Sequence, residues 1–224
     1  TEFKDAGYLP EALVNFLALL GWALDEKTEL FNRQELVEAF SLERVGKTGA
    51  VFDLEKLSWM NGMYIRKLSL EDFVARALPF WERDLAPGVK RPLDRGYLLQ
   101  MSPFIQERAR TLAEVASLSQ FFFEEPDYPT ELLTKGLGAE KALPALEVAV
   151  QKIAGAVDFT TESLESLFRP LAQELGLSTG AFFGLLRVAV TGRTASPPLF
   201  HTIAILGQKR CLARLEAAHR KLGA

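Results

Sequence analysis

Cationic side chains gather at the C-terminal end of the sequence, where they could bind a polyanion. From Arg187 onward there are seven, against the single acid Glu216. They are Arg187, Arg193, Lys209, Arg210, Arg214, Arg220 and Lys221. The preceding residues hold 19 Lys and Arg against 28 Asp and Glu, so an overall charge of −3 combines an acidic body with a basic end. This asymmetry indicates an anionic partner such as nucleic acid, with a solvated helix face as the alternative.

Residues suited to catalysis or metal binding are scarce. No glycine-rich phosphate loop and no G-x-S-x-G sequence occurs, and His201 and His219 stand 18 positions apart. One cysteine, Cys211, allows neither a disulfide nor a Cys/His zinc site. Arg210 beside it could lower the thiol pKa, although a lone cysteine on an amphipathic helix is usually a small core residue. We therefore expect neither catalysis nor a bound metal or cofactor in this chain.

The elements that would position these side chains are predicted to be helices, so the fold class is mainly α. Pro10 before an apolar i, i+3, i+4, i+7 pattern, Asn32 with Glu35, and Ser69 with Asp72 are helix-start signals. Short extended pieces are expected only near Phe3 and at 51–52. The predicted helices are 11–20, 33–40, 53–62, 71–80, 93–100, 103–117, 141–150, 162–175, 179–190, 199–205 and 209–221.

The 224 residues, 48% apolar and 25% charged, fit one large domain or two to three smaller ones and exclude disorder. No apolar run reaches the ~18 residues of a membrane span and no signal peptide is recognisable, so a cytoplasmic location is expected. The sequence begins at Thr1 and has no initiator methionine, so we expect it to be a fragment of a longer protein. Residues 86–92, 123–138 and 191–198 read as connectors, and 123–138, with its prolines, glycines and acids, is the predicted domain boundary.

Two segments closely resemble the region after the KMSKS-type loop in bacterial glutamyl-tRNA synthetases. They read GYLPEALVNFLALLGW at 7–22 and VFDLEKLSWMNGMYIR at 51–66, the latter matching at Phe52, Asp53, Lys56, Leu57, Trp59 and Asn61. QERARTL at 106–112 and LLRVAVTGRTASPPLF at 185–200 resemble the family more loosely.

The resemblance implies a C-terminal tRNA-binding portion without the catalytic Rossmann domain. It implies a stem-contact domain at 1–68 and helical anticodon-binding domains at 69–127 and 128–224. The parent enzyme would be a class I glutamate–tRNA ligase using ATP and magnesium, whereas this chain would be an inactive, monomeric partner of tRNA-Glu. A helical protein–protein scaffold and a regulatory or anticodon-stripping paralogue are the alternatives.

The same resemblance assigns roles to single residues. Arg108 would read the last anticodon base through its planar fork of donors, with Arg110 as the competitor because the register can slip by two. Arg187, Ser196, Pro197 and Leu199 would hold the first two bases.

Other cations would contact the tRNA backbone, which positions the RNA without reading its sequence. These are Lys56, Arg66, Lys67, Arg193, Lys209 and Arg210. Trp59 lies on an apolar helical stripe and is expected to be a core residue.

Overall fold

The computed structural model describes residues 2–46, 49 and 51–223. Every regular element in this part of the chain is a helix, as the sequence predicts. The chain forms two compact units, Thr1–Ser119 and Gln120–Ala224. Each unit is described by itself.

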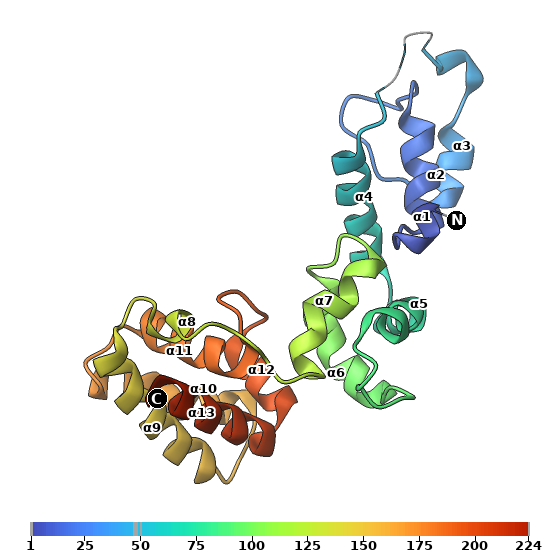
Figure 1. The fold of residues 1–224 in the computed structure, drawn as a ribbon. Helices are drawn as coiled ribbons and strands as arrows, with labels where there is room; N and C mark the ends of the chain where they lie inside the picture. Colours follow the sequence, from blue (N-terminus) through green and yellow to red (C-terminus); the bar gives the residue numbers. More distant parts are fainter. Residues whose placement is uncertain (1, 47–48, 50, 224) are drawn as a thin grey trace. The chain divides into compact units, whose positions relative to one another are not determined.

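The first unit begins with three helices whose starts follow from local sequence (Figure 1). They are α1 (Glu2–Asp5), α2 (Pro10–Leu19) and α3 (Arg33–Ala39), followed by the 3-10 turn η1 (Leu42–Arg44). Pro10 occupies the first turn of α2, where its missing N–H costs nothing. Asn32 caps α3 in a capping box with Glu35.

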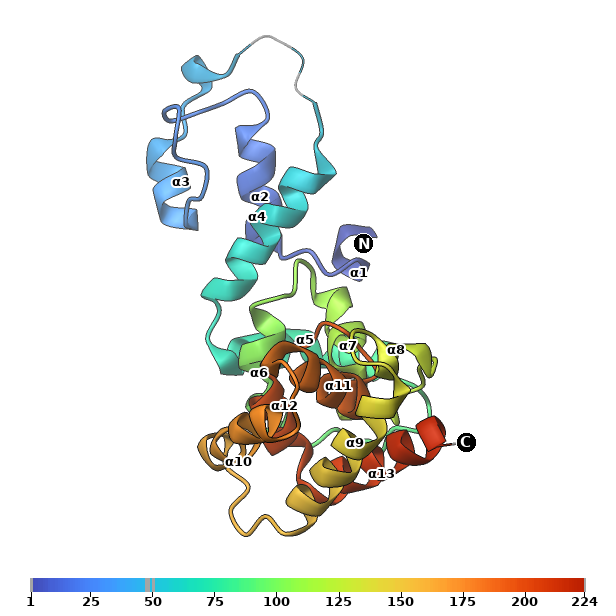
Figure 2. The ribbon, with the colours of Figure 1, turned by 90° about the vertical axis from the view of Figure 1, so that its left-hand side faces the viewer.

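Helix α4 (Leu54–Lys67) crosses α2, as Figure 2 shows, and packs Leu57 and Met60 against Phe16. Asp53 caps it by accepting a hydrogen bond from the Lys56 N–H. The helix runs beyond the end predicted near Gly62. Gly62 lies in the interior of the helix and is buried against the backbone of Ala109 and Arg110, so it does not end the helix.

Three further helices complete the first unit: α5 (Leu70–Asp84), α6 (Arg95–Gln106) and α7 (Val115–Ser119), with η2 (Leu112–Glu114) between the last two. The indole N–H of Trp81 donates to Ser119 Oγ at 2.9 Å in their shared core. We predicted separate helices at 93–100 and 103–117, which is wrong. Helix α6 continues through Pro103 because Leu98, Met101 and Ile105 bury one continuous face.

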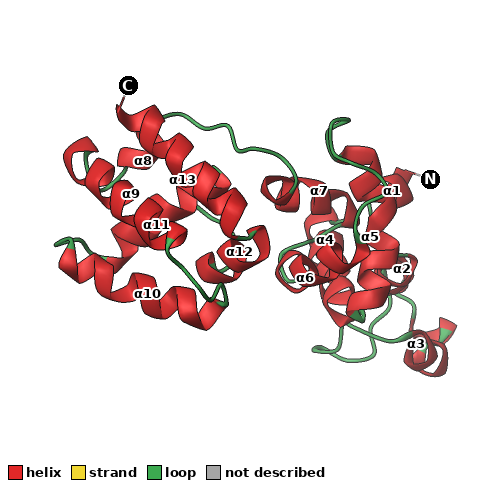
Figure 3. Ribbon diagram, turned by 90° about the horizontal axis from the view of Figure 1, so that it is seen from below, coloured by secondary structure: helices red, strands yellow, loops and turns green. Residues whose placement is uncertain are grey.

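The second unit opens with η3 (Gln120–Phe122) and the short α8 (Glu131–Thr134). Its five longer helices are α9 (Ala139–Ala154), α10 (Thr161–Glu174), α11 (Thr179–Thr191), α12 (Leu199–Leu206) and α13 (Gln208–Gly223). Figure 3 shows α9, α11 and α13 side by side. Phe168, Phe182 and Phe200 form an aromatic core between α10, α11 and α12.

Two local predictions differ from the structure. Phe3, expected to be extended, lies in α1, and 51–52 form no strand. The division between units falls between Ser119 and Gln120, before the segment 123–138 that composition singles out. The start of that segment belongs to the second unit because Arg214 of α13 binds it. The domain ranges 1–68, 69–127 and 128–224 remain predictions.

Candidate nucleic-acid interface

One face of α4 lies against residues 107–110, which brings the predicted RNA contacts of two sequence segments together. Asn61 fixes this segment, because its amide donates to the Arg110 carbonyl oxygen at 2.6 Å and its Oδ1 accepts from the Leu9 N–H at 2.7 Å. Arg66, five residues further along α4, donates to the Glu107 carbonyl oxygen at 3.5 Å. Arg66, Arg108 and Arg110 therefore lie on one exposed face of the first unit.

The two candidate readers of the last anticodon base are held differently. Arg108 donates to the Phe104 carbonyl oxygen at 3.0 Å and lies 3.5 Å from the Glu107 carboxylate, with its side chain 37% exposed. Arg110 lies 3.5 Å from the Glu55 carboxylate and is 62% exposed. Solvent-exposed ion pairs of this kind contribute only about 0–1 kcal/mol, so an RNA phosphate or base can replace either carboxylate.

Trp59 is not the core residue we predicted. It is 45% exposed and shares an open surface depression with Lys56 and Arg110. The buried positions of α4 are Leu57, Met60 and Ile65, and Trp59 lies off that stripe. The neighbouring acids Glu29, Asp53 and Glu55 line the same depression, and Lys56 pairs with Glu29 at 2.6 Å. This depression is thus not a purely cationic surface, which weakens the case for a phosphate contact at Lys56.

Lys67, the last residue of α4, is exposed near the ring of Tyr64. Burial raises the pKa of Tyr64 to about 12, and its hydroxyl hydrogen-bonds to the Phe31 carbonyl oxygen and to Asn15. Tyr64 is therefore uncharged at neutral pH, and its ring lies next to the accessible ammonium group of Lys67.

In the second unit, Arg187 contacts the turn that follows its own helix. Its Nη1 donates to Ser196 Oγ at 2.6 Å and to the Pro197 carbonyl oxygen at 2.7 Å. A charged arginine on the mostly apolar helix α11 requires either exposure or a partner, and Arg187, which is half-buried, has these partners. Pro197 and Leu199 are buried, whereas Thr194 and Ala195 are exposed at the tip of the loop. The arginine thus fixes the loop whose tip is accessible to a ligand.

The loop is also fixed where it leaves α11. Gly192 has φ +71°, a left-handed conformation that ends the helix, and a Cβ there would stand 2.9 Å from the Pro126 Cβ. The Thr191 hydroxyl donates to the Arg187 carbonyl oxygen at 2.7 Å. Both ends of the 192–198 loop are therefore defined by short-range contacts.

The basic C-terminal end is less cationic at its surface than its charge count indicates. Arg214 is 2% exposed and donates to the carbonyl oxygens of Phe121, Val190 and Glu124 at 2.7–2.8 Å. Its Nε lies 3.1 Å from the Glu125 carboxylate. Sequence reasoning counted Arg214 with the RNA-facing charges, but it is a structural residue.

Three more of these cations also make contacts inside the second unit. Arg210 donates to the Phe122 carbonyl oxygen and Lys221 to that of Tyr128. Arg193 lies over the Phe121 ring, 5.4 Å from its centroid, and partial burial lowers its pKa. Lys209, by contrast, is exposed on α13.

Cys211 is fully buried on α13. Burial raises its pKa to about 12, and the nearby charges of Arg214 and Arg210 only partly oppose this effect. The thiol is therefore neutral and unsuited to nucleophilic chemistry. In the described part of the chain no group of three or more His, Cys, Asp or Glu side chains could hold a metal ion, and no helix is long and apolar enough to cross a membrane.

Comparison with known proteins identifies the family. The family model described as an anticodon binding domain matches residues 72–219, and the model for the catalytic domain of class I tRNA synthetases (E and Q) matches residues 1–59. Glutamate–tRNA ligases of Dehalococcoides mccartyi and Roseiflexus castenholzii are 48% and 46% identical over 223 and 226 residues. These alignments cover 99% and 100% of this chain, but only 46% and 45% of the relatives, so the chain spans about half their length.

A solved structure has the same fold. A glutamate–tRNA ligase from Elizabethkingia meningosepticum, crystallised with its amino acid, superposes with a TM-score of 0.87 at 24% identity, over 98% of this chain and 43% of that one. The anticodon-binding family model alone covers more than half of the sequence. The chain therefore belongs to the anticodon-binding-domain family, in the form found in glutamate–tRNA ligases, which are class I aminoacyl-tRNA synthetases.

Proposed function

We propose that this chain recognises tRNA-Glu by its anticodon and stem, as the tRNA-binding part of a glutamate–tRNA ligase. The observation that carries the proposal is the contact of Arg187 with Ser196 and Pro197. A loop fixed at both ends, with an accessible tip, is suited to reading unstacked bases through backbone groups and short side chains.

In this proposal Arg187, Ser196, Pro197 and Leu199 form the site for the first two anticodon bases. Leu199, 5% exposed, anchors the start of α12 beneath the loop. Arg187 orients the loop, and the exposed Thr194 and Ala195 lie where the bases would enter.

Arg108 is the proposed reader of the last anticodon base. One guanidinium nitrogen, Nη1, donates to the Phe104 carbonyl oxygen, and the side chain is 37% exposed. The planar guanidinium fork matches the acceptors of cytosine and opposes the donors on the Watson–Crick edge of guanine. Arg110 is the alternative reader, two residues on.

The proposed phosphate contacts fall into two groups, exposed cations and cations that already contact another part of the protein. Arg66, Lys67 and Lys209 are exposed and suited to the tRNA backbone. Lys56, Arg193 and Arg210 would first have to leave Glu29, the Phe121 ring and the Phe122 carbonyl oxygen.

Attachment of glutamate to tRNA with ATP and magnesium is proposed for the longer ligase and not for this chain. No nucleotide-phosphate loop occurs in the sequence, and Arg76 and Arg83 are already paired with Glu11 and Asp84. We further propose a cytoplasmic monomer. Absence of ATP–pyrophosphate exchange by the purified chain is the expected result.

The decisive experiment is binding of the chain to tRNA-Glu and tRNA-Gln transcripts over a range of salt concentrations. The logarithm of affinity should fall linearly with the logarithm of salt, by about 0.7–0.9 for each phosphate contacted. Lys209→Gln should reduce that slope by one such step, and Lys27→Gln, an exposed lysine on a loop of the first unit, should not.

A flat salt dependence with no preference between the tRNAs would refute the proposal and favour a protein–protein scaffold. A regulatory or anticodon-stripping paralogue would bind tRNA-Glu equally well. The sequence encoded upstream of Thr1 separates that alternative from a ligase, since only a ligase needs a KMSKS-type loop there.

A further inference from the structure

The turn at 107–112, which carries both candidate readers of the last anticodon base, is held by contacts from outside itself. Helix α6 ends at Gln106, so the turn begins where the regular hydrogen bonds of that helix stop. The N–H and carbonyl groups of Arg110 and the N–H of Leu112 are bonded to other segments of the first unit. An irregular turn of this kind keeps one conformation to the extent that such partners fix its backbone.

Two side chains hold the backbone of Arg110, one at each of its polar groups. The Arg110 N–H donates to Glu114 Oε2 at 2.8 Å, and the Arg110 carbonyl oxygen accepts from Asn61 Nδ2 at 2.6 Å. Asn61 is fully buried on α4, whereas Glu114 is half-buried in η2. Because the N–H and the carbonyl are held separately, the backbone of Arg110 cannot rotate without losing a hydrogen bond.

Asn61 is itself fixed to the N-terminal segment of the first unit. Its Oδ1 accepts from the Leu9 N–H at 2.7 Å, and its Nδ2 lies 3.4 Å from the Gly7 carbonyl oxygen. That carbonyl oxygen accepts from the Leu112 N–H at 2.9 Å, at the far end of the same turn. Gly7 has φ +83°, and a Cβ there would stand 2.3 Å from the Ala113 nitrogen, so a side chain at this position would break the contact.

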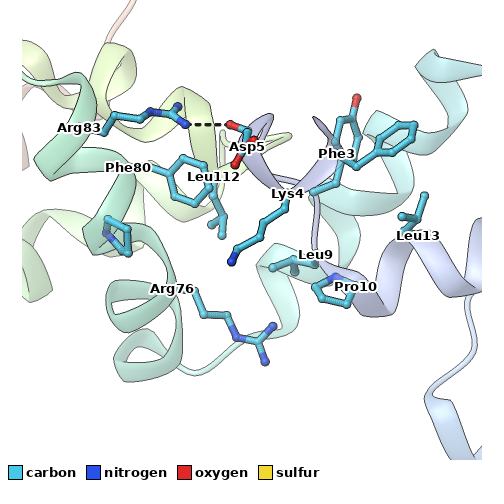
Figure 4. Close-up of a pocket in the computed structure, with 12 residues that line it drawn as sticks. Phe3, Lys4, Asp5, Leu9, Pro10, Leu13, Arg76, Phe80, Arg83 and Leu112 are labelled. Atoms are coloured by element: carbon cyan, nitrogen blue, oxygen red, sulfur yellow. Dashed lines mark hydrogen bonds between the residues drawn. The ribbon is translucent and has the colours of Figure 1, made fainter. Parts of the chain in front are cut away.

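The N-terminal segment is also attached to α5 and to the core. The Arg83 guanidinium of α5 donates to the Asp5 carbonyl oxygen at 2.9 Å, as Figure 4 shows. The side chains of Leu9 and Leu112 are both buried and line the same apolar pocket. The 107–112 turn is therefore bonded to a segment that is anchored elsewhere in the first unit.

We propose that Asn61 and Glu114 are positioning residues for anticodon reading, which set the base preference of the chain through the backbone of Arg110. This inference rests on the proposed function, in which an arginine of the 107–112 turn reads the last anticodon base. Arg108 and Arg110 share that turn, so a shift of its backbone moves either guanidinium relative to the base. A bidentate contact with a base depends on geometry, whereas a phosphate contact carries no sequence information. Loss of either hydrogen bond should therefore reduce the preference for tRNA-Glu more than it reduces general tRNA affinity.

The test measures the ratio of the affinities of the chain for tRNA-Glu and tRNA-Gln transcripts. Glu114→Ala and Glu114→Gln both remove a negative charge, but only glutamine keeps an oxygen that can accept from the Arg110 N–H. Glu114→Ala should lower the ratio roughly 3–10-fold, the range of one net hydrogen bond, and Glu114→Gln should keep it within about 2-fold of wild type. Glu26→Ala, at an exposed loop position of the first unit, is the control for a lost surface charge.

Asn61→Ala tests the other side of the same backbone. It should lower the affinity ratio at least as much as Glu114→Ala, because the Leu9 N–H loses its partner together with the Arg110 carbonyl oxygen. Amide hydrogen exchange should be faster in the peptides that contain residues 7–9 and 107–112 and unchanged in the second unit. If Asn61→Ala does not fold, the two Glu114 variants decide the test.

The outcomes separate this inference from the proposed function. If Glu114→Ala weakens both tRNAs equally and leaves the ratio unchanged, the residue has only a structural role and the inference is overturned. Equal losses of the ratio in Glu114→Ala and Glu114→Gln would attribute the effect to charge and overturn it as well. In both cases the wild-type preference for tRNA-Glu stands. A wild-type chain without that preference would instead refute the proposed function, and this inference with it.

Discussion

The guanidinium of Arg187 is 2.6 Å from the hydroxyl of Ser196, nine residues further along the chain. This hydrogen bond joins helix α11 to the loop that precedes α12. It links a side chain that is half-buried to a loop whose tip is exposed. The conformation of the loop therefore depends on a residue of the preceding helix.

Removing the Ser196 hydroxyl should weaken tRNA binding more than it weakens the fold. Ser196→Ala deletes one of the charge-assisted contacts of Arg187 and leaves the bond to the Pro197 carbonyl oxygen. We expect a loss in tRNA-Glu affinity of about 5–10-fold, the effect of about 1–1.5 kcal/mol. Filter binding measures it, with Ser166→Ala, an exposed serine of α10, as the control. Equal losses in both variants would exclude a role for the hydroxyl.

Arg108 should let the chain distinguish tRNA-Glu from tRNA-Gln, whose anticodons differ only in the last base, cytosine against guanine. A matched bidentate contact is worth roughly 1–3 kcal/mol in the DNA case, a factor of about 5–150 in affinity. Arg108→Gln should remove this preference while retaining general tRNA affinity. If only Arg110→Gln removes it, the reader is the residue two positions on; if neither does, both assignments fail.

Replacing Arg214 by methionine should destabilise the second unit by about 3–5 kcal/mol. The substitution leaves buried carbonyl oxygens of Phe121, Val190 and Glu124 without their donor. Urea unfolding followed by circular dichroism measures the change. Arg220→Met, on the same helix but 70% exposed, should change the free energy of unfolding by less than about 0.5 kcal/mol.

The Cys211 thiol should make the fold sensitive to alkali. The pKa of the thiol is about 12 in the folded protein, against an ordinary value of 9.0. Between these two pH values the unfolded chain has released the thiol proton, whereas the folded chain retains it. Stability from this group is complete below pH 9 and falls by about 1.4 kcal/mol per pH unit above it. Comparing urea unfolding of wild type and Cys211→Ala at pH 8 and pH 10 isolates this contribution. An identical pH dependence in the two proteins would contradict it.

The helix starts could be predicted because they depend on neighbouring residues. Asn32, Asp53 and Ser69 all accept the capping hydrogen bonds that their spacing indicates. The end of α4 could not be predicted, because Gly62, a local stop signal, lies inside a helix that packs against Ala109 and Arg110, 47 and 48 residues on.

The candidate site was predictable to a similar extent. The apolar character of α11 indicates that Arg187 must be either exposed or paired, and the structure shows the second. The structural role of Arg214 was missed, although a signal existed: Arg214 falls at the i+3 position after Cys211 and four before Ala218, on the buried stripe of α13. Two of its three backbone acceptors, Phe121 and Glu124, lie 93 and 90 residues earlier in the sequence, where no local pattern indicates them.

The hydrogen bonds between α13 and residues 121–128 have a consequence for synthesis on the ribosome. The hydrogen bonds from Arg210, Arg214 and Lys221 span 88–93 residues. The beginning of the second unit therefore cannot make these contacts before α13 is available. During translation this unit stays unfinished until α13 has left the exit tunnel. A nascent chain arrested before α13 should therefore expose the aromatic side chains of Phe121 and Phe122 to chaperones, whereas emergence of α13 lets the unit bury them.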